Sequence, residues 1–139
     1  MSARDIFHEA AKHALEKDGW EITDDPLRLR WGGATVQIDL GATRLIGAKR
    51  GEETIAVEIK SFQGASALSE FHTALGQYLN YLTILEGVEP DRHLFLAVTA
   101  DVYAEFLSQQ RLTQKQIERY EIKIIVFDPL EEVIVQWLT

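Results

Sequence analysis

The sequence contains no cysteine, which excludes disulfides, thiolate metal sites and thiol nucleophiles. It also has no apolar run that approaches the roughly 20 residues of a membrane-spanning helix, so we expect no membrane partner. The first residues, Met-Ser-Ala-Arg-Asp, are charged early and lack the apolar core of a signal peptide. These absences predict a cytoplasmic protein.

Positive charge is scarce as well, since 14 Lys and Arg stand against 22 Asp and Glu, for a net charge of -8. Proteins whose main task is to hold duplex nucleic acid usually carry a basic face. An interaction with DNA would therefore need divalent cations, a partner or a small basic patch. The candidates for such a patch are Arg28, Arg30, Arg44, Lys49 and Arg50. A surface charge kept for solubility is the alternative.

The residues that are present are typical of a globular protein. Hydrophobic residues make up 46% and charged residues 26% of the chain, and the length suits one domain, 1–139, with a sizeable core. Apolar side chains recur at helical spacing over 4–18 and again over 66–86. Gly19 should end the first helix and Gly87 the second, as glycine commonly does.

Alternating apolar and polar residues predict strands between these helices and near the C-terminus. The segments are "WEIT", "LRLRW", "ATVQIDL", "TRLIGAKR", "TIAVEIK", "IKIIVFD" and "VIVQWL". A turn at 50–52 should join the fourth and fifth segments into a hairpin. The apolar run His93–Thr99 is typical of a strand covered on both faces, and helices should follow at 102–110 and 114–119. The long helix should cross over to make the strands on either side of it parallel, which predicts an α/β fold with a mixed sheet.

Three charged residues stand where the predicted sheet should be dry. Alternate side chains of a strand share a face, so Glu58 and Lys60 of "TIAVEIK" lie on one side and the isoleucines and valine on the other. Asp39, nineteen residues before Glu58, ends "TVQID". If these strands are neighbours, Asp39, Glu58 and Lys60 can converge.

This group of residues suits phosphodiester hydrolysis. Two carboxylates can hold Mg²⁺ or Mn²⁺, because hard oxygen ligands suit a hard cation. Lysine can orient the attacking water or offset the charge that grows on the phosphate. A solvated strand face is the alternative. A second Glu-Ile-Lys, at 121–123, has no aspartate strand before it, so we interpret it as structural.

The order of Asp39 and "EIK" within helix, strands, helix and strand resembles the restriction-endonuclease-like, or PD-(D/E)xK, superfamily. Three longer stretches, "HEAAKHALEKDGWEITDDPLRLR", "IDLGATRLIGAKRGEETIAVEIKSF" and "FHTALGQYLNYLTILE", resemble the XisH family, the cyanobacterial fdxN element excision controlling factors. With the "LAV" strand and "FDPLEEVIVQW", the likeness extends over nearly the whole chain. It implies an α-β-β-β-α-β core of the restriction-endonuclease type, with extra C-terminal helices and strands.

The resemblance also implies roles for particular residues. Asp39 and Glu58 would bind the metal, and Lys60 would be the catalytic lysine. Glu9, on the first helix, matches an acid that some nucleases of this fold add to the metal site. Gln77, in the long helix, matches a glutamine or basic residue beside the active site. A flanking surface charge for Glu9 and a plain polar position for Gln77 are the alternatives.

Two main functions follow from the resemblance. The first is a nuclease-like protein that assists site-specific excision of a DNA element during heterocyst development, with a Mg²⁺- or Mn²⁺-dependent endonuclease site. The second is a non-catalytic interaction module that regulates a recombinase through a partner of the XisI family. A toxin-like half of a two-protein system is a third interpretation, and a homodimer is left open.

Overall fold

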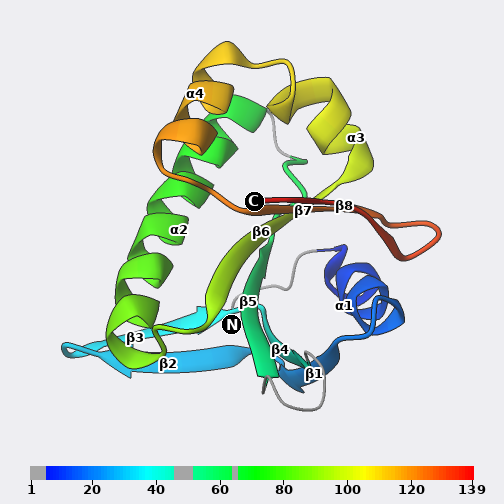
Figure 1. The fold of residues 1–139 in the computed structure, drawn as a ribbon. Coiled ribbons are helices and arrows are strands. Elements are labelled where there is room, and N and C mark those ends of the chain that lie inside the picture. The colour runs from blue at the N-terminus through cyan, green and yellow to red at the C-terminus, as the bar shows by residue number, and fades with distance from the viewer. Residues whose placement is uncertain (1–5, 46–51, 64–65) are drawn as a thin grey trace.

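The computed structural model describes residues 6–45, 52–63 and 66–139. The chain starts with one helix and five strands, continues with a long helix and a strand, and closes with short helices and two strands (Figure 1). In order these are α1 (His8–Lys17), β1 (Glu21–Asp24), β2 (Leu27–Trp31), β3 (Ala34–Ile38), β4 (Leu40–Leu45), β5 (Glu52–Ile59), α2 (Ala67–Val88), β6 (His93–Thr99), α3 (Ala100–Val102), the π-helical turn η1 (Tyr103–Leu107), α4 (Arg111–Arg119), β7 (Ile124–Asp128) and β8 (Val133–Leu138). Among the described residues, no helix is both long and apolar enough to cross a membrane.

Six strands form one mixed sheet in the order β1-β4-β5-β6-β7-β8. The pairs β5–β6 and β6–β7 are parallel, and the other pairs are antiparallel. Helix α2 connects β5 to β6, because parallel neighbours need a long crossover connection. The prediction of a mixed-sheet α/β fold with this crossover is confirmed.

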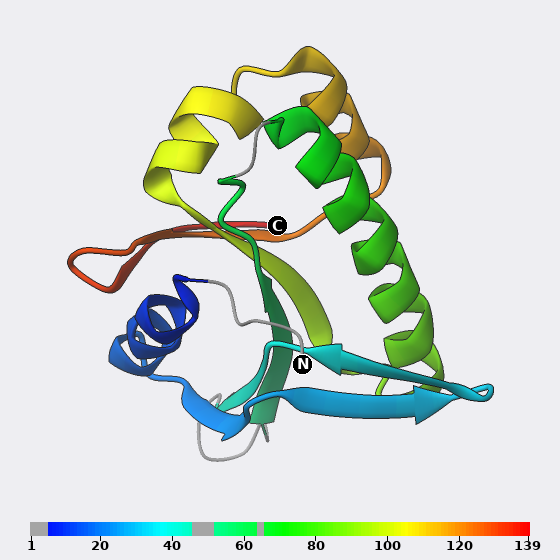
Figure 2. The ribbon, with the colours of Figure 1, turned by 180° about the vertical axis from the view of Figure 1, so that it is seen from behind.

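Two apolar cores lie on opposite faces of the sheet, because side chains alternate along each strand. Helix α2 and the loops around η1 cover one face, and α1 covers the other (Figures 1 and 2). Along β5, Ile55, Val57 and Ile59 are buried on the α1 side, while Ala56 is buried on the α2 side. Glu58 lies between two residues of the α1 core and is therefore directed to the α2 side.

Strands β2 and β3 form a separate two-stranded sheet, called here the β-arm, which runs beside the end of α2 (Figure 2). Its turn is made by Gly32 and Gly33, whose positive φ values of 58° and 82° suit a tight hairpin turn. Trp31 at this turn packs against Gly87, so closely that a Cβ on Gly87 would lie 2.7 Å from the indole ring. The β-arm is thereby fastened to the C-terminal turn of α2.

Some predicted boundaries differ from the structure. The segment "ATVQIDL" is not one strand, because the chain bends at Asp39 and passes from the β-arm into the six-stranded sheet. The first helix begins at His8, the helix predicted at 102–110 is α3 followed by η1, and α4 begins at Arg111. Most of the predicted turn at 50–52 lies outside the described residues. The strands on either side of it, β4 and β5, pair antiparallel.

Candidate metal and phosphodiester site

Asp39 occupies the bend at which the chain changes sheets, between Ile38 of β3 and Leu40 of β4. The backbone N–H of Ile59 donates to Oδ2 of Asp39 at 2.7 Å. The backbone N–H of Asp39 in turn donates to Oε1 of Glu58 at 3.3 Å. These two hydrogen bonds hold the carboxylates of Asp39 and Glu58 together, as the sequence pattern predicts.

Glu58 is a buried acid, with 8% of its surface exposed. Burial is the largest cause that raises the pKa of Glu58, and the neighbouring Asp39 carboxylate adds to it, so that the pKa is about 8. The ammonium group of Lys60 acts in the opposite direction. A negative charge on Glu58 is unfavourable away from water and beside a second carboxylate, so Glu58 keeps its proton to higher pH than an exposed glutamate.

Lys60 lies directly after the end of β5. Its backbone N–H donates to the carbonyl of Ala97 at 3.0 Å, which continues the pairing with β6 for one more residue. Its Nζ lies 3.5 Å from Oε2 of Glu58, and the side chain is 28% exposed. Lys60 therefore offers one positive charge at the solvent side of the acid pair.

Tyr81 of α2 is a member of the site that the sequence analysis does not single out. Its hydroxyl group interacts with the carboxyl group of Glu58. Burial, followed by the charges of Glu58 and Asp39, raises the pKa of Tyr81 to about 12. The sequence feature that could have identified Tyr81 is its position four residues after Gln77, because residues spaced by four share one face of a helix.

Gln77 is half-buried, one turn before Tyr81 on α2. Its Oε1 is buried and has no hydrogen-bond partner among the described residues. A buried amide oxygen without a partner is unusual in a folded protein. Its helical spacing from Tyr81 places Gln77 on the face of α2 that reaches Glu58, and its catalytic role stays a prediction.

Glu9 belongs to a different group of side chains. Its carboxylate lies with His8 and Asp25, and one ligand atom of each residue falls within 4.8 Å of the others. His8 Nε2 is 2.8 Å from Asp25 Oδ1, and Lys12 Nζ is 3.1 Å from Asp25 Oδ2. A lysine ammonium beside Asp25 already neutralises part of the negative charge that would attract a cation. The assignment of Glu9 to the Asp39–Glu58 metal site stays a prediction.

The second Glu-Ile-Lys takes another role. Ile122, together with Ile124 and Val126 of β7, is buried in the core on the α2 side. Glu121 is exposed, with a positive φ of 51°, and Lys123 gives its backbone N–H to the hydroxyl of Tyr78 at 3.1 Å. This copy of the motif therefore packs the start of β7.

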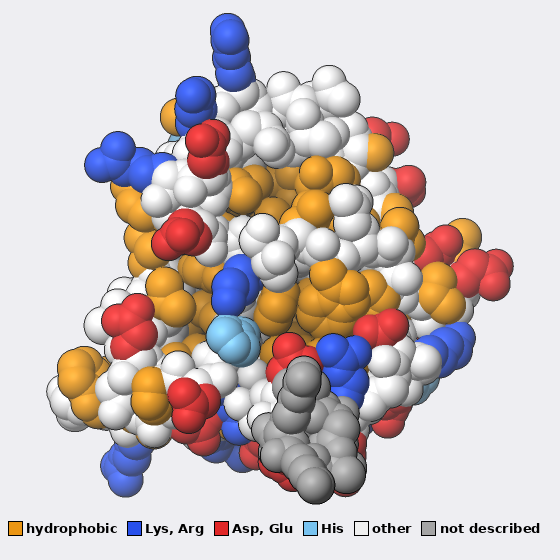
Figure 3. All heavy atoms as spheres, in the orientation of Figure 1, with side chains coloured by type: hydrophobic (Ala, Val, Ile, Leu, Met, Phe, Trp, Pro, Cys, Tyr) orange, Lys and Arg blue, Asp and Glu red, His pale blue; other side chains and the backbone are white. Residues whose placement is uncertain are grey.

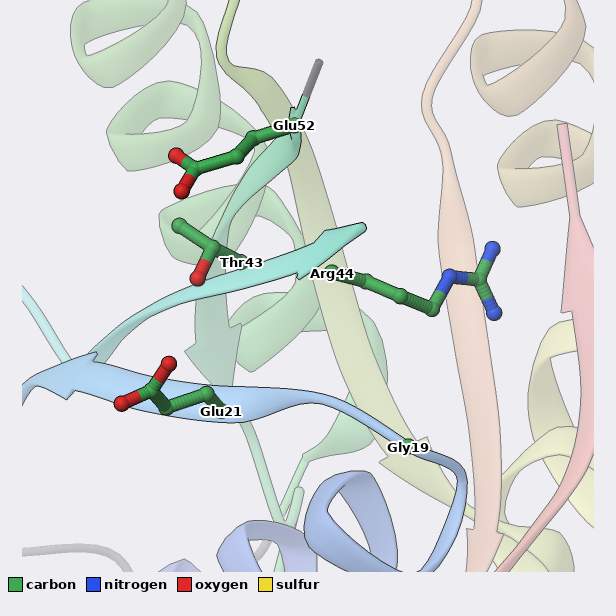
Figure 4. Close-up of a pocket in the computed structure, with 5 residues that line it drawn as sticks. All are labelled: Gly19, Glu21, Thr43, Arg44 and Glu52. Atoms are coloured by element: carbon green, nitrogen blue, oxygen red, sulfur yellow. The ribbon is translucent and has the colours of Figure 1, made fainter. Parts of the chain in front are cut away.

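A surface hollow lies towards the opposite end of β5. Its lining consists of Gly19, Glu21, Thr43, Arg44 and Glu52 (Figure 4). Glu52 begins β5, whereas Glu58 lies next to its last residue. Arg44 points away from Glu21 and Glu52 (Figure 4) and instead bonds Glu53 at 2.8 Å and stacks on Trp20. The hollow is thus separate from the acid pair.

The acid pair has the donors that a hard divalent cation requires. Asp39 and Glu58 each use one carboxylate oxygen to accept a backbone N–H, which restricts how the two groups can turn. A cation bound by both carboxylates would take the place of the proton on Glu58 and offset the repulsion that, after burial, raises the pKa of Glu58. The chemistry of the residues therefore fits Mg²⁺ or Mn²⁺.

Both a protein family and solved structures match this chain. The model of the family described as XisH protein matches residues 1–135. The chain belongs to the XisH family. Its fold is similar to the crystal structure of an XisH family protein from Nostoc punctiforme PCC 73102, with a TM-score of 0.87 and 44% identity over 97% of this chain and 100% of that chain.

A second crystal structure has the same TM-score. The crystal structure of a fdxN element excision controlling factor protein from Anabaena variabilis has a TM-score of 0.87 and 46% identity, over 98% of this chain and 100% of that chain. No curated protein matches the chain. The predicted resemblance to the XisH family is confirmed.

Proposed function

We propose that this XisH-family chain assists the site-specific excision of a DNA element and that Asp39, Glu58 and Lys60 form a Mg²⁺- or Mn²⁺-dependent phosphodiesterase site. The relative from Anabaena variabilis is a fdxN element excision controlling factor, which supports the first part. The observation that carries the second part is the contact of the half-buried Asp39 with the buried Glu58, with Lys60 Nζ 3.5 Å from Glu58 Oε2. An ordinary solvated strand face would not bury an acid such as Glu58 beside a second acid.

In this proposal each residue has a distinct task. Asp39 and Glu58 hold the metal, which supplies Lewis-acid polarisation of a phosphate oxygen. Lys60 orients water near phosphorus and offsets the negative charge that grows as the new bond forms and the ester P–O bond breaks. Tyr81 and Gln77 lie on α2 beside this centre, where the hydroxyl group of Tyr81 interacts with Glu58.

The decisive experiment uses the two Glu-Ile-Lys copies as a matched pair. Purified protein, alone and with a XisI-like partner, is incubated with plasmid and branched DNA in Mg²⁺ or Mn²⁺. The wild type and Glu121→Gln should cleave or nick DNA, and Glu58→Gln should lose at least about a hundredfold in rate, as expected when metal-held charge stabilisation is removed. Equal rates for Glu58→Gln and Glu121→Gln would contradict the proposal.

A second candidate function is a non-catalytic module that regulates a recombinase through a XisI-like partner. Two observations favour it: the net charge of -8 and the satisfaction of both acids by internal hydrogen bonds. If it is correct, Asp39→Asn retains full stimulation of excision and full partner binding. If the phosphodiesterase site is correct, the same variant binds the partner but does not support excision.

A further inference from the structure

The outward face of the β-arm concentrates positive charge on an acidic protein. In β2, Leu27 and Leu29 are buried against the α2 side while Arg28 and Arg30 are exposed. The antiparallel register places Gln37 opposite Arg28 and Thr35 opposite Arg30, and both partners are exposed as well. We call these four residues, Arg28, Arg30, Thr35 and Gln37, the arm face.

The arm face contains no acid, and both of its arginines are exposed. No Asp or Glu occurs anywhere in 27–38. Within the described part of the chain, neither Arg28 nor Arg30 has an ion pair or a side-chain hydrogen bond, whereas Arg44 is bound by Glu53. The sequence suggested one patch, but the structure separates Arg44 from it, and Lys49 and Arg50 lie outside the described residues.

The arm face leads along β3 to the acid pair, but its arginines project away from the α2 side to which Glu58 is directed. Strand β3 ends at Ile38 and the next residue is Asp39, so the Arg28–Gln37 pair lies two residues along the strand from the site. Alternate residues of a strand are about 6.6 Å apart. Arg28 and Arg30 therefore present two guanidinium groups one after the other along β2. Figure 3 shows Lys and Arg side chains projecting from the lower edge of the molecule, under the β-arm.

We infer that the arm face binds the phosphate backbone of duplex DNA. This inference rests on the proposed function and specifies which surface receives the DNA. Guanidinium groups bind phosphate through paired hydrogen bonds, and Gln and Thr add neutral donors. A two-stranded ribbon is also a shape that DNA grooves accept. Because the proposed function acts on DNA, and because the arm face carries two exposed arginines and no acid, DNA rather than an acidic protein is the occupant.

The test compares two double variants that remove the same charge. Arg28→Gln with Arg30→Gln changes the arm face, and Arg111→Gln with Lys115→Gln changes α4, where both residues are exposed and unpaired within the described residues. Binding of a labelled 30-base-pair duplex is measured in Ca²⁺, with salt varied from 50 to 200 mM. Melting curves verify that each variant is folded.

Loss of two phosphate contacts should reduce the slope of log affinity against log salt by about 1.8. Between 50 and 200 mM salt, the fall in DNA affinity of the arm variant should therefore be roughly tenfold smaller than that of the wild type. At 50 mM salt the arm variant should bind the duplex more weakly than the wild type. The α4 variant should retain the wild-type slope. An equal reduction in both variants would mean unspecific attraction and would overturn the inference.

Other outcomes separate this inference from the proposed function. Unchanged binding by the arm variant overturns the arm face as the DNA surface but leaves the phosphodiesterase site standing if Glu58→Gln still abolishes cleavage. No duplex binding by wild type, alone or with a XisI-like partner, overturns both. Loss of partner binding in the arm variant, with DNA binding intact, assigns the arm face to a protein instead.

Discussion

Asp39 and Glu58, nineteen residues apart in the chain, are joined by a hydrogen bond from the backbone of one to the side chain of the other. The neighbour of Glu58, Ile59, returns a hydrogen bond to the carboxylate of Asp39 at 2.7 Å. This reciprocal arrangement brings two acids together in a place where one of them is 8% exposed. Their electrostatic repulsion is the property that the first two predictions test.

Metal binding should stabilise the wild type and not the acid variants. A ligand that binds only the folded state raises the free energy of unfolding by about 2.7 kcal/mol at a hundredfold excess over its dissociation constant. With Lys60 lowering the local negative charge, we expect millimolar affinity for Mg²⁺. Thermal melting should show this gain in wild type and in Glu121→Gln, but not in Asp39→Asn or Glu58→Gln. An equal gain in Asp39→Asn would exclude the Asp39–Glu58 metal site.

Stability should fall as pH rises through the range set by Glu58. Folding raises the pKa of Glu58 from 4.5 to about 8, so the folded chain holds a proton that the unfolded chain releases. The stabilisation is complete below about pH 4.5 and is lost as pH rises towards 8, with a slope of up to about 1.4 kcal/mol per pH unit. Glu58→Gln should remove this slope from metal-free melting curves. The difference in melting temperature from wild type should be largest near pH 8, and a constant difference from pH 5 to 8 would contradict this.

Tyr78 should contribute to stability through its hydroxyl group. It is 3% exposed, donates to the carbonyl of Leu94 at 3.0 Å and accepts the backbone N–H of Lys123 at 3.1 Å. Tyr78→Phe leaves both backbone groups without this partner and should cost about 1–3 kcal/mol in urea unfolding. Tyr120, which is 40% exposed, is the control, and Tyr120→Phe should change stability by less than about 0.5 kcal/mol. Similar values for the two variants would argue against the role given to the hydroxyl of Tyr78.

Two glycines of α2 should respond oppositely to alanine. A Cβ on Gly76 meets no atom within 4 Å, so Gly76→Ala should raise the free energy of unfolding by about 0.5–1 kcal/mol through helix propensity. A Cβ on Gly87 would lie 2.7 Å from the Trp31 ring, so Gly87→Ala should displace Trp31 and destabilise the β-arm. Chemical unfolding measures both, and tryptophan fluorescence should change only for Gly87→Ala. A stability gain at Gly87 equal to that at Gly76 would show that the β-arm is not fastened there.

The sequence by itself determined most of the helices and strands and which charged side chains at the end of β5 share a face. Alternation in "TIAVEIK" separated Glu58 and Lys60 from Ile55, Val57 and Ile59, and the structure places the two groups on opposite sides of β5. The long apolar-striped helix predicted the parallel pairing of β5 with β6. These predictions succeed because period and polarity are local properties, which the backbone geometry of a helix or strand converts directly into faces.

Only the tertiary structure decided which distant residues meet. The bend at Asp39, the hydroxyl of Tyr81 on Glu58 and the grouping of Glu9 with Asp25 all join residues from separate elements. The exposure of the β-arm arginines depends likewise on which strands pair and on which face α2 covers. Such contacts arise from how helices and sheets pack to bury their apolar faces, and no period within a single segment encodes the partner that it will find there.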